Sequence, residues 1–169
     1  METREAPFDF EAFFQAQYGG IARSIGRVVG DHARAEELAV EAFWKLWRSP
    51  RAHGENAGGW VYRTAVRLAL NELRRQKRSM RYELLSRDGT PSPTPEEAHA
   101  AAEEREQVRR VLAAINARQA ELLLLRSGGL SYNDLAVAID VKPASVGTLI
   151  GRAQHAFRQE YLKQFGGTK

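Results

Sequence analysis

Apolar positions along this chain recur every three or four residues, which is the spacing that places side chains on one face of a helix. The first segment with this period covers about residues 10–25. A second follows Asp31, a good helix cap, and covers about residues 32–47, while a third covers about residues 60–78. No alternating pattern typical of a strand reaches a useful length, so the sequence predicts an all-α fold.

A stretch of prolines and small polar residues interrupts the helical pattern at residues 86–95. Its prolines and glycine cannot build the interior of a helix. Thr94 and Pro95 then favour the start of a new helix, with Glu97 closing a capping box. We therefore expect two small helical modules joined by a Pro-rich acidic linker. The predicted division is residues 1–85, a linker with the start of the following helix at 86–107, and residues 108–169.

The segment from Leu130 to Arg152 predicts two short helices joined by a tight turn. Ser131 can cap the first of these helices, and Asp134 can complete a capping box. Asp140 and Val141 form the turn, and Pro143 suits the first position of the second helix. This layout is that of a helix-turn-helix, which places its second helix in a DNA groove. An ordinary helical hairpin has the same spacing, so the pattern alone leaves both interpretations open.

Composition argues against several classes of function. The chain has no cysteine, which excludes disulfides and thiolate metal sites and fits the cytoplasm. Its four histidines are scattered, and the glycines form no phosphate loop. No apolar run could span a bilayer, and the N-terminus lacks a signal pattern. We therefore expect a cytoplasmic protein that is not an enzyme, binds no metal or cofactor and does not insert into a membrane.

Charge is distributed unevenly along the chain, whose formal net charge is +4. Residues 88–107 carry one basic and six acidic side chains, so −5, and separate two basic regions. Residues 1–87 carry 15 basic and 11 acidic side chains, and residues 108–169 carry nine and four. Basic modules suit a polyanionic partner, although an ordinary solvated surface can have charges this modest.

The third predicted helix combines positive charge with aromatic residues. Trp60 and Tyr62 stand at its start, and only Glu72 opposes its basic side chains. Rings that stack on bases and cations that meet phosphates are typical of binding to single-stranded or distorted nucleic acid. Alternatively, Trp60 anchors the helix in the core and the basic residues complement the helix dipole. The basic residues are Arg63, Arg67, Arg74, Arg75, Lys77 and Arg78.

Three segments in this order and spacing resemble the extracytoplasmic-function sigma factors of bacterial RNA polymerase. The segments are residues 35–48 (AEELAVEAFWKLWR), residues 59–75 (GWVYRTAVRLALNELRR), and residues 129–136 (GLSYNDLA) with Arg152-Ala153 after them. The resemblance covers nearly the whole chain, from about Phe8 to Phe157, and the three segments together are highly specific.

The resemblance implies a division of labour between the helices. The second helix would dock on the clamp coiled coil of core RNA polymerase, with Glu37, Glu41 and Trp44 at the matching positions. The loop at about residues 51–59 would pocket an unstacked base of the −10 promoter element, and the basic third helix would hold the opened strand. The helix-turn-helix would read the −35 element and touch the polymerase flap. The acidic linker would pass through the RNA exit path.

The residues expected to contact promoter DNA fall into two groups. For the −10 element they are Asn56, Trp60, Arg63, Arg67, Arg74, Arg75, Lys77 and Arg78. For the −35 element they are Lys142, Ser145, Thr148 and Arg152. The family also implies restraint by an anti-sigma factor that clamps both modules, although no residue of the chain identifies one.

Some positions depart from the family pattern. Val40 stands where the docking helix usually has Gln, and Arg67 stands where Asn is common. The predicted recognition helix carries Gly147 and Gly151 and few basic residues. We therefore predict a sigma factor that directs polymerase to promoters and helps melt the −10 element. The alternatives are a sigma-like interaction protein that binds polymerase or a regulator without promoter-specific initiation, and a stand-alone repressor that binds DNA tightly without polymerase.

Overall fold

The computed structural model describes residues 8–86 and 96–166. For residues 83–86 and 96–99 it describes the backbone only. These residues form seven α-helices and one 3-10 turn, and no strand occurs among them. The all-α prediction is therefore confirmed. The helices are α1 (Phe10–Val29), α2 (His32–Trp47), α3 (Ala57–Ser86), α4 (Glu96–Ala114), α5 (Ala117–Ser127), α6 (Tyr132–Ile139) and α7 (Pro143–Phe165), with the 3-10 turn at Pro50–Ala52.

Local capping chemistry sets the ends of the first two helices. The Asp9 carboxylate accepts a hydrogen bond from the Ala12 amide at the start of α1. Gly30 ends α1 with φ +78°, a left-handed conformation that a side chain would strain. Asp31 then caps α2 through the Arg34 amide, as the sequence predicted. The turn between α1 and α2 is therefore encoded locally.

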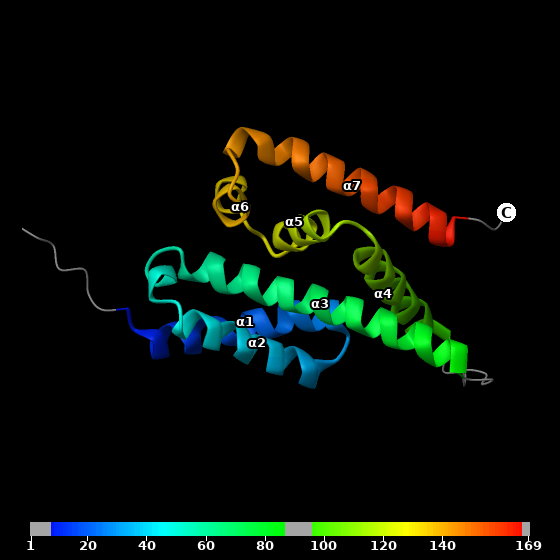
Figure 1. The fold of residues 1–169 in the computed structure, drawn as a ribbon, viewed down its shortest axis with the longest axis horizontal. Coiled ribbons are helices and arrows are strands. Elements are labelled where there is room, and N and C mark those ends of the chain that lie inside the picture. Colours follow the sequence, from blue (N-terminus) through cyan, green and yellow to red (C-terminus); the bar gives the residue numbers. More distant parts are fainter. Residues whose placement is uncertain (1–7, 87–95, 167–169) are drawn as a thin grey trace, which may run out of the picture.

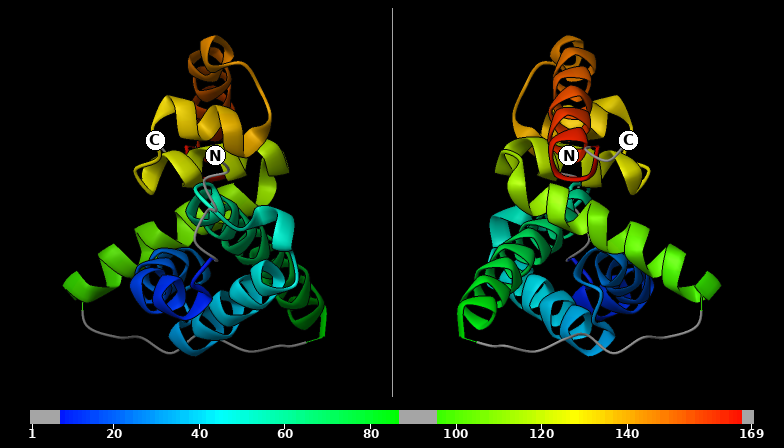
Figure 2. Two further views of the ribbon diagram at one scale, coloured as in Figure 1. Left: turned by 90° about the vertical axis from the view of Figure 1, so that its left-hand side faces the viewer. Right: turned by 90° about the vertical axis from the view of Figure 1, so that its right-hand side faces the viewer.

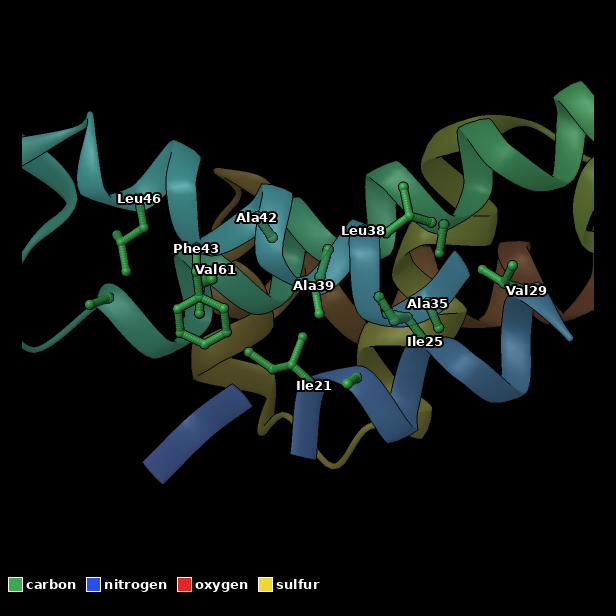
Figure 3. Close-up of a cluster of buried hydrophobic side chains, with 14 residues drawn as sticks. Ile21, Ile25, Val29, Ala35, Leu38, Ala39, Ala42, Phe43, Leu46 and Val61 are labelled. Carbon is green, nitrogen blue, oxygen red and sulfur yellow. The ribbon is translucent and has the colours of Figure 1, made fainter. Parts of the chain in front are cut away.

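The first hydrophobic cluster lies between α1, α2 and the N-terminal half of α3. Ile21 and Ile25 of α1 meet Leu38 and Phe43 of α2, and Val61 of α3 completes the contact. Figure 3 shows these side chains pointing toward one another from the three helices. Helix α1 continues without a break through Gly19 and Gly20. Burial of the apolar face on both sides of that pair holds the helix together.

Helix α3 contributes to a second hydrophobic cluster as well. Val66, Leu70 and Leu73 pack against residues of α4 and α5, including Leu112 and Leu125. Figure 1 shows α3 between the pair α1–α2 and the C-terminal helices, and both views of Figure 2 agree. The two parts of the chain therefore lie against a shared helix. Helix α3 is also longer than the predicted segment of about residues 60–78.

Helices α6 and α7 have the predicted helix-turn-helix layout. Ser131 and Asp134 form the complete capping box of α6. Asp140 ends α6 in the left-handed conformation (φ 54°), and Pro143 stands in the first turn of α7. Asn116 likewise caps α5 through the amide of the second residue that follows it. Thr94, Pro95 and most of the Pro-rich linker lie outside the described residues.

Candidate nucleic-acid interface

Two of the residues predicted to contact the −10 element, Arg63 and Arg67, form ion pairs with a carboxylate of the C-terminal part of the chain, which comprises helices α4 to α7. The Nε atoms of Arg63 and Arg67 donate to the Glu121 Oε1 of α5 at 2.6 and 3.0 Å. Glu121 is 6% exposed, whereas the side chains of Arg63 and Arg67 are 26% and 53% exposed. A carboxylate this buried requires charged partners, and the two arginines supply them.

Further along α3, Arg75 belongs to an ion-pair network with the first module. Its guanidinium donates to Glu72 at 2.6 Å, and Arg34 of α2 donates to the same carboxylate at 3.1 Å. Hydrogen bonds from Arg75 and then Arg34 lower the pKa of Glu72, against an opposing effect of burial. The Arg75 side chain is still 66% exposed, so it can meet a phosphate while Glu72 fixes its orientation.

Arg74 faces a different part of the surface. It lines a cleft of about 640 Å³ between α3, α5 and the end of α6, together with Arg63, Arg67 and Arg118. The Arg74 Nη2 atom is buried and has no hydrogen-bond partner among the described residues. Glu121 and Asp140 are the acidic side chains that line this cleft, so its lining carries more positive than negative charge.

The remaining residues predicted to contact the −10 element lie before and after the arginines of α3 along the chain. Lys77 and Arg78 are exposed on α3 beyond Arg75. Asn56 is exposed in the turn before α3, and its carbonyl accepts a hydrogen bond from the Trp60 amide at 3.0 Å. Trp60 is half-buried against the first hydrophobic cluster, so anchoring accounts for part of its role. The structure therefore distributes the eight residues along α3 and the turn before it.

The predicted polymerase-docking residues share the outer face of α2. Glu37 is 65% exposed and pairs with Arg34, and Glu41 pairs with Lys45 at 3.3 Å. Trp44 is 53% exposed, with the Arg48 guanidinium 4.7 Å from its ring centre. Tryptophan is enriched among the residues that carry most of the binding energy of protein interfaces.

The predicted −35 residues lie together on the exposed face of α7. Lys142 precedes the helix, Ser145, Thr148 and Arg152 follow at helical spacing, and all four are exposed. The opposite face of α7, with Val146, Ile150 and Ala153, is buried against the second cluster.

Sequence reasoning missed the residues that join the two parts of the chain. Glu121 is the lone acidic residue in an otherwise apolar run, residues 120–125, which was the available signal. Tyr62 was assigned only a stacking role, yet its hydroxyl lies 2.9 Å from the Ser24 hydroxyl and its ring faces Gly128. These contacts join distant segments, so helical periodicity could not reveal them.

Comparison with known proteins agrees with this geometry. Residues 13–79, which span most of α1 through most of α3, match the family model of sigma-70 region 2. The chain is also similar in fold to the sigma factor RpoE, solved in complex with the anti-sigma factor NepR from Bartonella quintana. That match has a TM-score of 0.51 and 20% sequence identity, and it covers 92% of this chain and 97% of that one.

The fold is therefore similar to that of a solved sigma factor, and residues 13–79 match the family model of sigma-70 region 2. The resemblance to the extracytoplasmic-function sigma factors is thereby confirmed. No helix in the described part of the chain has the length and hydropathy needed to cross a membrane. Among the same residues, no three side chains gather as metal ligands would.

Proposed function

We propose that this chain directs bacterial core RNA polymerase to promoters and helps melt the −10 element. The exposed face of α2 docks on polymerase, α3 holds the opened −10 strand, and α7 reads the −35 element. The observation that carries the proposal is the row of basic side chains along α3, within the segment that matches sigma-70 region 2. Guanidinium groups at helical spacing can follow the phosphates of one strand.

The proposed modules follow the predicted boundaries, with residues 1–85 for polymerase docking and the −10 element and residues 108–169 for the −35 element. A cytoplasmic location follows from this role, because promoter DNA and polymerase are there. The similarity to a sigma factor solved with an anti-sigma factor supports regulation of this chain by such a protein. A restraining protein of that kind would have to cover surfaces that polymerase or DNA otherwise uses.

Replacement of Arg74 and Arg75 by Ala tests the DNA-binding part of the proposal. We expect weaker open-complex formation, measured by permanganate reactivity of the −10 region with core polymerase and a promoter fragment, because two phosphate contacts are lost. The matched control is Arg110→Ala with Lys163→Ala, which removes the same charge from exposed positions of α4 and α7. Unchanged promoter opening in the Arg74/Arg75 variant would reject the role given to α3.

A second candidate function is supported by the low positive charge of the recognition helix. Of the four exposed residues proposed to read the −35 element, only Lys142 and Arg152 are basic. A sigma-like protein that binds polymerase or a regulator without reading promoters would show this feature too. Binding to core polymerase without initiation on any genomic fragment would favour that function.

A further inference from the structure

The contact between α3 and α5 uses the side chains that the proposed function gives to DNA. Glu121 accepts hydrogen bonds from both Arg63 and Arg67 through one carboxylate oxygen. A phosphate oxygen presents the same charge and acceptor geometry to a guanidinium as a carboxylate oxygen does. If α3 binds a strand as proposed, Glu121 occupies the place of one of its phosphates.

The rest of the interface holds this carboxylate in place. Leu122 and Leu125 of α5 pack in the same cluster as Val66 and Leu70 of α3. One residue before Arg63 on α3, the Tyr62 side chain lies against Gly128 at the end of α5. The contact between α3 and α5 is thus a packed interface that contains a buried ion pair. It differs from an exposed salt bridge, whose carboxylate stays in water.

A second set of contacts ties α4 to the end of α1. The Arg109 Nε donates to the carbonyl of Val28 at 3.1 Å, and its Nη2 reaches the carbonyl of Arg27 at 3.4 Å. These carbonyls belong to the last turn of α1, where a cation is favoured by the helix dipole. The C-terminal part is therefore held to both α1 and α3 in this arrangement.

We propose that Glu121 is an internal competitor of promoter DNA, which keeps Arg63 and Arg67 occupied until the C-terminal part moves away from α3. A strand that approached the closed chain would meet a carboxylate between the two arginines and would be repelled by it. Opening separates Glu121 from α3 and frees both guanidinium groups. The inference rests on the proposed function only for the identity of the competing ligand; the closed contact itself is a property of the free chain.

The test replaces Glu121 by Gln, which keeps the size of the side chain and removes its charge. The matched control is Glu160→Gln on α7, which removes the same charge from a carboxylate paired only locally, with Lys163 and Gln164. Because the chain has no cysteine, Gln15→Cys and Gln159→Cys can be introduced at exposed sites of α1 and α7 and labelled with a fluorescent donor and acceptor. Circular dichroism melting establishes that each variant is folded.

Two readouts are made on each folded variant. The first is energy transfer between α1 and α7 in the free chain, without DNA. The second is the affinity for a labelled single-stranded oligonucleotide of mixed sequence, measured by fluorescence anisotropy. For Glu121→Gln we expect lower transfer and a gain in affinity of at least about fivefold over Glu160→Gln, the low end of typical conformational coupling.

The outcomes separate the competitor from the proposed function. Transfer in Glu121→Gln equal to that in wild type would overturn the closed contact as a restraint. Lower transfer with unchanged oligonucleotide affinity would overturn competition at Arg63 and Arg67. A further variant adds Arg63→Ala to Glu121→Gln. If Arg63→Ala lowers the affinity for the oligonucleotide, α3 binds the strand, and an unchanged affinity in Glu121→Gln overturns only the competition by Glu121. If Arg63→Ala has no effect, the result counts against the DNA interface itself.

If Glu121→Gln does not fold, Glu121→Asp provides the same test. The shorter side chain keeps the charge inside the interface but cannot reach both Nε atoms at their present distances. We then expect an affinity for the oligonucleotide above that of wild type and of the Glu160→Gln control, with reduced transfer. Wild-type values in both readouts would overturn the proposal.

Discussion

Gly128→Ala provides a test of the closed arrangement that leaves every charged group in place. Gly128 ends α5 with φ −76°, a conformation that alanine adopts without strain. A Cβ atom at this position would overlap the Tyr62 hydroxyl and lie 2.5 Å from the Cζ atom of its ring. The cost of the substitution therefore comes from this contact between α5 and α3 and not from the backbone.

Its magnitude follows from the overlap. Forcing a methyl group into a packed contact costs about 1–3 kcal/mol, because the neighbours must leave their preferred positions. Separation of α5 from α3 relieves the overlap completely, so the free energy of opening should fall by up to this amount. The ratio of open to closed chains should then rise by about 5- to 150-fold.

The assay is energy transfer between α1 and α7 in the free chain, together with hydrogen exchange at the amides of α5. We expect lower transfer and faster exchange in Gly128→Ala. Tyr62→Leu in the same background removes the ring that the methyl group would overlap, so the two substitutions should be non-additive in a double-mutant cycle. Transfer unchanged by Gly128→Ala, or strict additivity with Tyr62→Leu, would show that the contact between Gly128 and Tyr62 does not hold α5 against α3.

Two further predictions concern stability. The pKa of Glu72 is lowered by Arg75 and Arg34, so this carboxylate stabilises the fold above its unfolded-state pKa, and the contribution is lost as the pH falls through the folded-state pKa. We measure the unfolding free energy by urea titration at a series of pH values. In Glu72→Gln this free energy should fall less steeply than in wild type as the medium becomes acidic. Equal slopes for the two proteins would contradict the prediction. Ser131→Ala should lower the unfolding free energy by about 1 kcal/mol, because α6 loses its cap, and Ser127→Ala at the end of α5 serves as the control. A cost no larger than that of the control would contradict the capping box.

The local features of the fold were predictable from the sequence. The caps Asp31 and Ser131 each depend on one side chain and an amide three residues away, and both are confirmed. The helix-turn-helix follows from the same kind of pattern, because Pro143 and the turn before it are contiguous with the helices they separate.

The position of α3 between two clusters was not predictable in this way. Val61 and Leu73 belong to the same helix, yet Val61 packs in the first cluster and Leu73 in the second. In the sequence, a helix with apolar residues on two faces shows a single wide apolar face. Which part of that face packs against which neighbouring helix depends on the tertiary structure. The placement of Glu121 against Arg63 depends in turn on that packing, so the sequence offered only an acidic residue in an apolar run.

The exposed surfaces could be located from the sequence only through the family resemblance. Glu37, Glu41 and Trp44 lie on one outer face of α2, where their spacing required them to be. Spacing explains why they share a face, but it does not identify the partner that covers that face.

Run-off transcription with bacterial core RNA polymerase and genomic promoter fragments shows whether this chain directs the polymerase to promoters. We expect initiation at specific sites that depends on the added chain and is lost in the Glu41→Ala, Trp44→Ala variant, which remains folded because both side chains are on the surface. Failure of the chain to associate with the polymerase even at low ionic strength, or association without specific initiation, would show that it is not a promoter-directing sigma factor.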